Sequence, residues 1–312
     1  MGHQQMKVIY VMGTARSGST ILGVTLGNCE NIFYAGELGG WLVKSGISSL
    51  GGAERTRFWS TVRDEVKDAE DLFGDEAQSA LEESLSLFRV RKWPLRRQLR
   101  DRYRRIAEEL YLAIGRAAGV THIVDTSSHP LRARQLRQLD RIDLYLVFLV
   151  REPQSVVASF TTPPAQFSKS KVVTNAYIWL TNMLSLFVFL RHRRDRRIFI
   201  RYEDFIANPG STLRHILRIV DLPADPPDLT LLRTGIPFQG NRRVLRKEEI
   251  FGLWGQASRP PSTSLLTGLV QRPWTVLFSR MRLRAEAGAD ESIVQEEAGQ
   301  PEPSHTRNSE RT

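Results

Sequence analysis

The order of hydrophobic and polar positions along the chain predicts a set of short buried strands. Unbroken apolar runs rich in β-branched residues are typical of parallel strands that are covered on both faces. Such runs lie at Lys7 to Met12, His122 to Asp125 and, as the strongest example, Leu144 to Val150. Shorter runs at Asn31 to Ala35 and Phe199 to Tyr202 bring the expected number of strands to about five.

Segments between these strands have the spacing or composition of helices. We expect single helices at Ser19 to Leu26, Pro153 to Phe160, Asn175 to Arg191 and Ser211 to Val220, and two or three helices within Glu54 to Ala118. Strands that alternate with helices argue for a parallel sheet covered on both sides. The predicted fold is therefore α/β: a P-loop-like, three-layer fold with a central, mostly parallel sheet of about five strands flanked by helices.

The length and composition favour one domain with a tail. The 312 residues, 41% of them hydrophobic, are enough for a single large core. We assign residues 1–285 to this domain, with a helical insertion at about 44–118. Residues 286–312 carry seven acidic residues against two arginines and almost no large apolar residues, so we predict a disordered acidic tail there.

Cysteine content and hydropathy bear on the cellular location. The single cysteine, Cys29, rules out a disulfide framework and a cysteine-based zinc site, and the six histidines show no metal-ligand spacing. The first residues lack the pattern of a signal peptide. Ala176 to Leu190 is apolar but shorter than a membrane span and contains polar residues, so we expect a buried helix, with Trp179 in the core. The expected location is the cytoplasm.

The formal net charge of +10 suggests an anionic partner or simply a basic, solvated surface. The segment from Arg89 to Arg105 is the most basic, with nine basic residues against one acid. It could recognise a sulfated or phosphorylated group or a lipid head group. We interpret it as a solvated helix face.

The glycine-bracketed loop GTARSGST, from Gly13 to Thr20, carries the most informative chemistry. It fits the Walker A pattern G-x-x-x-x-G-K-[ST] at every position but one, because Ser19 stands where the lysine is required. Loop amides and a helix N-terminus bind anions, but without that lysine a nucleoside triphosphate is disfavoured. Arg16 supplies a cation earlier in the loop. The alternative is an ordinary glycine turn; we favour a site for a single 5′-phosphate.

A second anion site is predicted after the strongest strand. Arg151 follows Val150 directly, and Ser159 comes eight residues later in REPQSVVAS. Ligands of open parallel sheets bind beyond the carboxyl ends of the strands, where both residues are expected. A guanidinium and a hydroxyl suit a phosphate. Alternatively, Arg151 forms a salt bridge at the strand end and Ser159 is a small packing residue.

These motifs together resemble those of sulfotransferases that use 3′-phosphoadenosine-5′-phosphosulfate (PAPS). The loop GTARSGST resembles their 5′-phosphosulfate loop, and VFLVREPQSVVASF resembles their 3′-phosphate motif. The segment from Tyr202 to Phe205 resembles their YEDL segment, and Gly240 to Arg243 resembles the GN-x-x-R stretch of bacterial and tyrosylprotein-like members. An arginine at position 16, where many members have lysine, fits that branch.

The resemblance implies PAPS as the sulfonate donor and no metal. It also implies which residues hold the donor. Those expected at the 5′-phosphosulfate are Arg16, Ser17, Gly18, Ser19 and Thr20, and those expected at the 3′-phosphate are Arg151 and Ser159, assisted by Arg243 or Arg246 there or at the adenine edge. Related bacterial proteins often read DSSK after the third strand; here the stretch from Asp125 ends in His129, so a lysine acting on the leaving group is not expected.

Transfer also needs a base for the acceptor proton. We expect Glu37, in the Gly36-Glu37-Leu38-Gly39 turn about twenty residues after Arg16, to be the catalytic base, as the resemblance suggests. The alternative is a glutamate that only satisfies backbone donors at a helix start. His129 is the second candidate, as base or as a cation at the leaving oxygen, unless it is only a turn residue.

Two other functions remain open at this point. One is a P-loop nucleotide kinase or NTPase that lacks the Walker lysine, and the other is a non-enzymatic basic module that binds anions. The acceptor for a sulfotransferase would be a small molecule, a lipid or a carbohydrate rather than nucleic acid, and tyrosine in a peptide also stays open. We expect no transmembrane segment, and contact with a membrane surface is compatible with the charge. The sequence does not indicate an oligomeric state.

Overall fold

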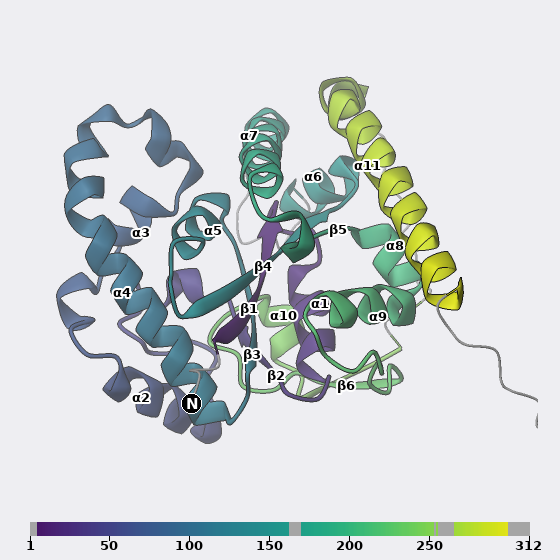
Figure 1. Cartoon of the computed structure of the whole chain (residues 1–312). Helices are drawn as coiled ribbons and strands as arrows, with labels where there is room; N and C mark the ends of the chain where they lie inside the picture. The colour runs from purple at the N-terminus through teal and green to yellow at the C-terminus, as the bar shows by residue number, and fades with distance from the viewer. Residues whose placement is uncertain (1–4, 162–169, 253, 255–264, 299–312) are drawn as a thin grey trace, which may run out of the picture.

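The centre of the molecule is a parallel sheet of five strands (Figure 1). The computed structural model describes residues 5–161, 170–252, 254 and 265–298. The spatial order of the strands is β2-β3-β1-β4-β5. Their bounds are Met6–Gly13 for β1, Ile32–Gly36 for β2, His122–Ser128 for β3, Ile142–Val150 for β4 and Arg197–Arg201 for β5.

Strand β1 lies in the middle and pairs with β3 on one side and β4 on the other. Its pairing with β4 runs without a break from Met6 opposite Ile142 to Gly13 opposite Leu149. Both strands are almost wholly apolar, and a strand buried on both faces needs that pattern. All four pairings within this central sheet are parallel, so the predicted α/β class and five-stranded sheet are confirmed.

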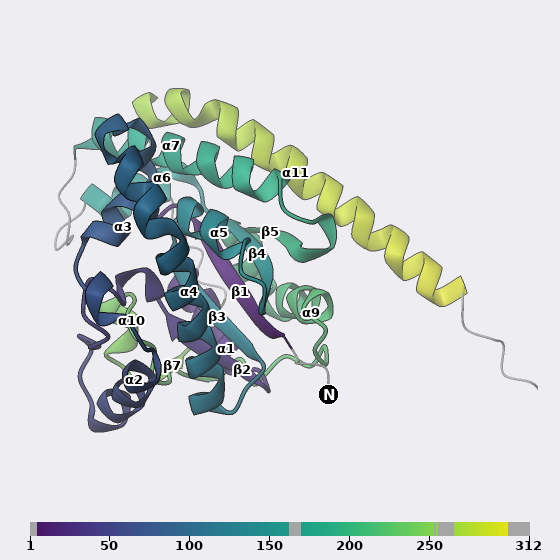
Figure 2. The same ribbon diagram turned by 60° about the vertical axis from the view of Figure 1, so that its left-hand side comes forward.

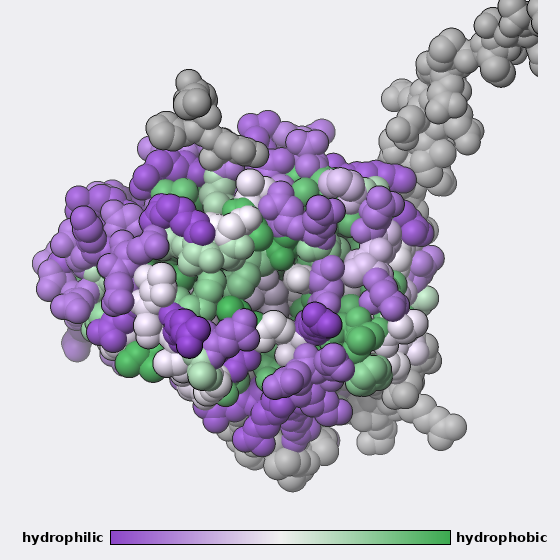
Figure 3. All heavy atoms as spheres, turned by 90° about the horizontal axis from the view of Figure 1, so that it is seen from below, coloured by the Kyte–Doolittle hydropathy of each residue, from purple (hydrophilic) through white to green (hydrophobic). Residues whose placement is uncertain are grey.

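Helices cover both faces of the sheet (Figures 1 and 2). On one face α4, α5, α7 and α11 pack against a core that includes Tyr111, Phe148 and Phe278. On the other face α1 and α9 pack against a core that includes Leu22 and Leu217. Their bounds are Ser19–Gly27 for α1, Trp93–Ala118 for α4, Pro130–Leu136 for α5, Lys171–Leu190 for α7, Pro209–Ile219 for α9 and Leu265–Ala298 for α11. Seen from below, hydrophilic side chains cover most of the periphery (Figure 3).

The region between β2 and β3 is helical, as the sequence predicts. Short 3₁₀ turns link its three α-helices, and the longest, α4, crosses the sheet on the α5 side (Figure 2). The basic segment forms the turn η4 and the first half of α4. The remaining bounds in this region are Leu38–Gly40 for η1, Ala53–Glu65 for α2, Glu70–Leu72 for η2, Glu76–Leu81 for α3, Ser84–Phe88 for η3 and Val90–Lys92 for η4.

The C-terminal part differs from the sequence-based expectation. Ser211 to Val220 was expected to be the last core helix, but α11 adds Trp274 and Phe278 to the core. The predicted disorder begins at Glu286, whereas the structure continues α11 to Ala298; residues 299–312 lie outside the described part. Smaller elements complete the chain: α6 at Pro153–Thr161, η5 at Arg194–Arg196, α8 at Tyr202–Ala207, β6 at Leu231–Arg233, α10 at Arg242–Leu245 and β7 at Glu249–Phe251.

Helix α7 is the one helix among the described residues that is long and apolar enough to cross a membrane by length and composition. Half of its apolar window is buried inside the fold, so the same features also suit a core helix. Trp179 was predicted to lie in the core, but 40% of it is exposed, whereas Asn182 is buried. The helix therefore turns Asn182, rather than Trp179, toward the protein.

Candidate active site

The loop from Gly13 to Thr20 joins β1 to α1, and its two glycines adopt positive φ angles. Gly18 has a φ of 94°, and a Cβ there would lie 2.2 Å from the ring of Tyr202, so only glycine fits. Arg16 also has a positive φ, of 70°, which is uncommon for a non-glycine residue and marks local strain. The hydroxyls of Thr14 and Ser17 are hydrogen-bonded at 2.6 Å, and this closes the loop internally.

The first amides of α1 have no acceptor inside the helix, as at every helix start, and they face the loop. With the positive end of the helix dipole, this makes an anion site. Ser19 and Thr20 begin α1 and line a cavity of about 630 Å³, together with Arg16 and Gly18. Ser17 is not among the lining residues, because its buried hydroxyl is paired with Thr14.

The second predicted anion site lies in the same cavity. Arg151, at the end of β4, and Ser159, on α6, both line it. Arg151 donates a hydrogen bond of 3.2 Å from Nη1 to the carbonyl oxygen of Arg16. Its guanidinium carbon also lies 4.5 Å from the centre of the Tyr202 ring, a cation–π distance. Arg151 is thus held between the loop and α8 with its charge at the cavity.

Glu37 lies at the end of the neighbouring strand and lines the cavity too. It follows β2 and precedes the turn η1. The Glu37 amide donates a 2.8 Å hydrogen bond to the Gln239 carbonyl. Two residues later, the Gly39 amide donates a 2.8 Å hydrogen bond to Ser127 Oγ. The backbone around Glu37 is therefore fixed on both sides while its side chain faces the cavity.

The environment of Glu37 favours its protonated form. Burial, with the negative charge of Asp125 nearby, raises the pKa of Glu37 from 4.5 to about 7, against an opposing effect of Arg16. A carboxyl group with a pKa near neutrality can exchange a proton under physiological conditions. This is the property expected of a general base.

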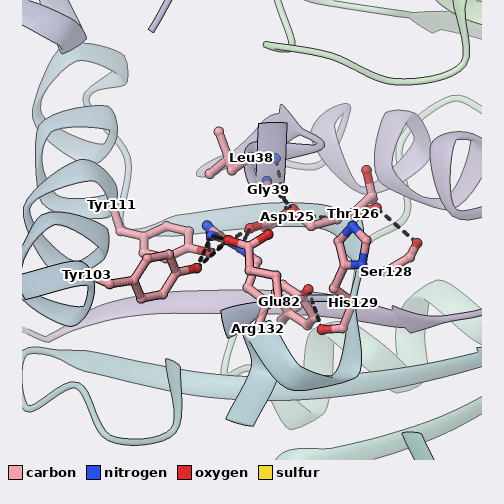
Figure 4. Close-up of polar contacts among 12 residues, drawn as sticks. Leu38, Gly39, Glu82, Tyr103, Tyr111, Asp125, Thr126, Ser128, His129 and Arg132 are labelled. Carbon is pink, nitrogen blue, oxygen red and sulfur yellow. Dashed lines mark hydrogen bonds and ion pairs between the residues drawn. The ribbon is translucent and has the colours of Figure 1, made fainter. Parts of the chain in front are cut away.

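A buried polar network lies behind this turn (Figure 4). The Arg132 guanidinium donates to Glu82 Oε1 at 2.8 Å, to the Tyr103 hydroxyl at 2.6 Å and to Asp125 Oδ2 at 3.4 Å. The Tyr111 hydroxyl donates to Asp125 Oδ2 at 2.6 Å. All these side chains are at most 3% exposed. Charges so deeply buried need this pairing.

The network reaches the cavity through Asp125 and Ser127. Asp125 Oδ1 accepts hydrogen bonds from both the amide and the hydroxyl of Ser127. Ser127 in turn holds Gly39, as described above, and a Cβ on Gly39 would come within 2.9 Å of Glu82 Oε2. The network therefore positions the turn that carries Glu37, and Asp125 is a positioning residue.

His129 also lines the cavity, at the start of α5 (Figure 4). Its carbonyl oxygen accepts a 2.9 Å hydrogen bond from the Tyr10 hydroxyl. Ser128, its neighbour, has a positive φ of 65°, an uncommon conformation that turns the chain at the cavity. Both catalytic candidates, Glu37 and His129, thus face the same space as Arg16.

The segment with the GN motif, Gly240 to Arg243, forms another part of the cavity wall, next to β2. Phe238 donates a 2.8 Å backbone hydrogen bond to Ala35, and the Asn241 amide donates to Thr20 Oγ1 at 3.3 Å. On α10 it is Arg242 that lines the cavity. Arg243 and Arg246, the two arginines that the sequence suggested, are exposed and are not among the lining residues.

Several residues at the site gave no signal in the sequence. Tyr177 and Thr181 on α7, Phe160 on α6 and Ser84 on η3 come from segments whose pattern only indicates helices. Tyr177 accepts a 3.0 Å hydrogen bond from the Ala15 amide in the loop. Helical spacing places Tyr177 and Thr181 on one face, but it does not say that this face meets the loop.

The basic segment lies elsewhere. Arginines of α4 and α5 line a separate depression of about 300 Å³: Arg96, Arg97, Arg100, Arg104 and Arg134. None of them lines the cavity of the loop.

Within the described residues, no group of three or more His, Cys, Asp or Glu residues is arranged to hold a metal.

Comparison with known families identifies the class of protein that this fold and loop define. A model described as the sulfotransferase family matches residues 9–226, which is more than half of the chain. The chain therefore belongs to the sulfotransferase family. The matched range contains the loop, the two motifs predicted to bind anions and Glu37. A search of curated proteins gives no match.

Similar solved structures have low sequence identity. The sulfotransferase domain from the curacin biosynthetic pathway is 19% identical, with 87% of this chain and 98% of that one covered and a TM-score of 0.49. The sulfotransferase domain of the Synechococcus PCC 7002 olefin synthase is 19% identical, covers 88% and 97%, and has a TM-score of 0.48. Sulfotransferase STF1 from Mycobacterium tuberculosis is 19% identical, covers 71% and 69%, and has a TM-score of 0.45.

Proposed function

We propose that this protein transfers a sulfonate group from PAPS to a hydroxyl or amine of an acceptor. The family implies a sulfonate donor such as PAPS. The observation that supports PAPS itself is that one cavity is lined by Arg16, Arg151 and Ser159 from two separate anion motifs. Two phosphate-type sites in one cavity suit a nucleotide with one 5′-linked and one 3′-linked phosphate. A cavity of about 630 Å³ is in the usual size range for such ligands.

The hydrogen-bond donors and cations of the cavity fit an anionic nucleotide without a triphosphate tail. In our proposal the amides at the start of α1 and the hydroxyls of Ser19 and Thr20 hold the 5′-phosphosulfate. Arg16 stabilises the charge that develops on the phosphate oxygen as the sulfur–oxygen bond breaks. Arg151 and Ser159 hold the 3′-phosphate. Arg242, which lines the cavity, takes the role at the 3′-phosphate or the adenine edge that the sequence predicts for Arg243 or Arg246.

Glu37 acts as the general base in this proposal. Its carboxylate accepts the acceptor proton while the acceptor oxygen or nitrogen forms a bond to sulfur, and adenosine 3′,5′-bisphosphate departs. The reaction then depends on positioning and charge stabilisation. The raised pKa of Glu37, about 7, makes it a sufficiently strong base once it is ionised. His129 is the alternative proton acceptor in the same cavity.

We assign the acceptor side to six of the cavity residues that belong to neither anion motif. They are Ser84, Ser127, Ser128, His129, Tyr177 and Thr181. The five hydroxyl groups and the imidazole of this set suit an acceptor with polar groups, and we propose a small molecule, a lipid or a carbohydrate. A cytoplasmic location and the absence of a nucleic-acid partner stay predictions from the sequence.

Two experiments test the proposal. Thermal unfolding with adenosine 3′,5′-bisphosphate should show a clear rise in midpoint, while ATP with Mg²⁺ should show little; the reverse result would support a kinase or NTPase. Incubating the protein with PAPS carrying a labelled sulfonate and a cell extract should then move the label to one class of acceptor. The Glu37→Gln variant is the matched control and should leave the label on the donor.

A further inference from the structure

Helix α7 has large apolar side chains on its solvent-exposed side as well as on its buried side. Its buried side is mixed: it contains the polar residues Thr174, Asn175, Thr181, Asn182 and Ser185 and the apolar residues Ile178, Leu184, Val188 and Phe189. Its exposed side carries large apolar ones: Val172, Val173, Trp179, Met183, Phe187 and Leu190. Phe187, for example, is 48% exposed. Water is a poor solvent for such a face, and an exposed apolar stripe of this length marks an interaction surface.

Helix α11 extends this apolar surface. It contacts α7, and the two helices lie side by side along the upper edge of the molecule in Figure 2. The two helices are joined by the ring contact of Trp179 with Trp274, at 5.2 Å, and by hydrogen bonds from Gln271 and Asn175. The outward side of α11 is again apolar, and Leu269 is 73% exposed. Its exposed apolar residues are Leu265, Leu266, Leu269, Val270 and Val276.

The charged residues of α7 and of the first part of α11, up to residue 285, are all basic; the acidic residues of α11 begin at Glu286. Neither residues 170–190 nor residues 265–285 contain an acidic residue. Lys171 begins α7, and Arg191 at its end has its guanidinium carbon 3.6 Å from the centre of the Phe187 ring. Arg272 and Arg280 lie on the outward side of α11, at helical spacing from Leu269 and Val276. Among the described residues, no carboxylate forms an ion pair with any of these four cations.

We propose that the outward faces of α7 and α11 dock the protein on an anionic membrane surface. Apolar side chains would enter the boundary between head groups and acyl chains, and the lysine and arginines would meet the lipid phosphates. A second copy of the chain is disfavoured as the occupant, because a symmetric pair would bring these unpaired cations against each other. Helix α7 lies on the membrane instead of spanning it, since one side of the helix, with its polar residues, is buried against the fold.

Docking by α7 places the active-site cavity beside the membrane. Tyr177 and Thr181 line the cavity from the same helix that presents Trp179 and Met183 outward. A lipid surface on α7 would therefore lie one helix diameter from the cavity wall. The docking itself does not depend on the proposed sulfotransfer, and it is tested without any donor or acceptor.

Vesicle sedimentation tests the proposal with the full-length protein. Vesicles of phosphatidylcholine with about 30 mol% phosphatidylglycerol should bind the protein, and pure phosphatidylcholine vesicles should bind it at least about tenfold more weakly. The double variant Met183→Asp, Phe187→Asp should lose about tenfold or more of its binding to the anionic vesicles. The matched control is Phe251→Asp, an exposed aromatic residue on β7, which packs on the opposite face of the sheet. It should bind like the unchanged protein.

A second pair of substitutions keeps the apolar surface and reverses its charge. Arg272→Glu with Arg280→Glu should weaken binding to anionic vesicles and leave the weak binding to neutral vesicles unchanged. Thermal unfolding checks that each variant is folded. The proposal is overturned if the unchanged protein ignores both kinds of vesicle, or if the aspartate variant binds as well as the control. It is also overturned if ultracentrifugation shows a dimer that the aspartate variant dissociates.

Discussion

The guanidinium of Arg151 donates a 3.2 Å hydrogen bond to the carbonyl oxygen of Arg16, across 135 residues of sequence. This bond joins the two motifs predicted to bind phosphate, because the backbone of the loop Gly13 to Thr20 accepts a hydrogen bond from the arginine that follows β4. The carbonyl of Arg16 belongs to a residue with a strained, positive φ. Arg151 therefore both supplies a positive charge to the cavity and is hydrogen-bonded to the backbone of the loop.

Removing Arg151 should weaken donor binding strongly. For Arg151→Ala we expect the affinity for adenosine 3′,5′-bisphosphate to fall about 10- to 100-fold, the loss typical of a charge-assisted hydrogen bond. Arg151→Lys should recover only part of it, because an ammonium lacks the planar group that stacks on Tyr202. Calorimetric titration measures both. Arg233→Ala, an exposed arginine away from the cavity, is the control, and equal losses in both alanine variants would contradict the role of Arg151.

Replacing Glu37 should separate binding from turnover. Glu37→Gln keeps the shape of the side chain but cannot accept a proton, so we expect turnover to fall about 100- to 10,000-fold. The dissociation constant of adenosine 3′,5′-bisphosphate should change little. Rates with an identified acceptor, together with titration of the product nucleotide, check this. If His129→Ala abolishes turnover and Glu37→Gln does not, His129 is the base.

The reaction should depend on pH through Glu37. Its pKa of about 7 means that the carboxyl is protonated, and inactive as a base, below that pH. We therefore expect kcat to rise about tenfold per pH unit on the acid side and to level off above about pH 7. A pH–rate profile between about pH 5 and pH 9 measures this. A flat profile across that range would exclude Glu37 as the titrating base.

Glu37 should also reduce the stability of the folded protein above neutral pH. Its pKa is raised on folding from 4.5 to about 7, so the folded state holds a proton that the unfolded chain has already lost between these values. Stability is therefore lost as the pH rises from 4.5 to about 7, and the loss remains above that range. Glu37→Gln should raise the free energy of unfolding on the order of 1–3 kcal/mol at about pH 8 and hardly at all below about pH 4. Urea unfolding at both pH values, with exposed Glu30→Gln as control, provides the measurement.

Breaking the buried network should destabilise the fold. Arg132→Ala leaves Glu82 and Asp125 buried without their cation, and we expect a cost of about 3–5 kcal/mol in the free energy of unfolding. The double variant Arg132→Met, Glu82→Leu removes one carboxylate with the cation and should cost clearly less. Urea unfolding compares them. If the single and double variants lose the same stability, the penalty does not come from an unpaired Glu82.

The positions of the strands along the chain and the loop could be predicted because their signals are local. A run such as Leu144 to Val150 fits only a buried strand, and Gly18 stands where a positive φ is required. Parallel strands bring their carboxyl ends to one edge, which is why Arg16, Glu37, His129 and Arg151 all line one cavity.

The parts that were missed depend on which faces of helices meet. Nothing in the spacing of α4 says that Tyr103 and Tyr111 enclose Arg132. Trp179 was assigned to the core because large aromatic residues are usually buried, and the exposed face of α7 shows the opposite. Arg242, instead of Arg243 or Arg246, lines the cavity, and a four-residue helix such as α10 has too little periodic pattern to predict which of its arginines does so.

Calorimetric titration with adenosine 3′,5′-bisphosphate tests the central claim most directly. The account predicts one binding site per chain, with binding weakened at least about tenfold when the 3′-phosphate is removed, as in adenosine 5′-monophosphate. Arg16→Ala and Arg151→Ala should each reduce the affinity further. No binding at millimolar concentration, or tighter binding of ATP with Mg²⁺, would contradict a cavity built for a nucleotide with separate 5′- and 3′-phosphates.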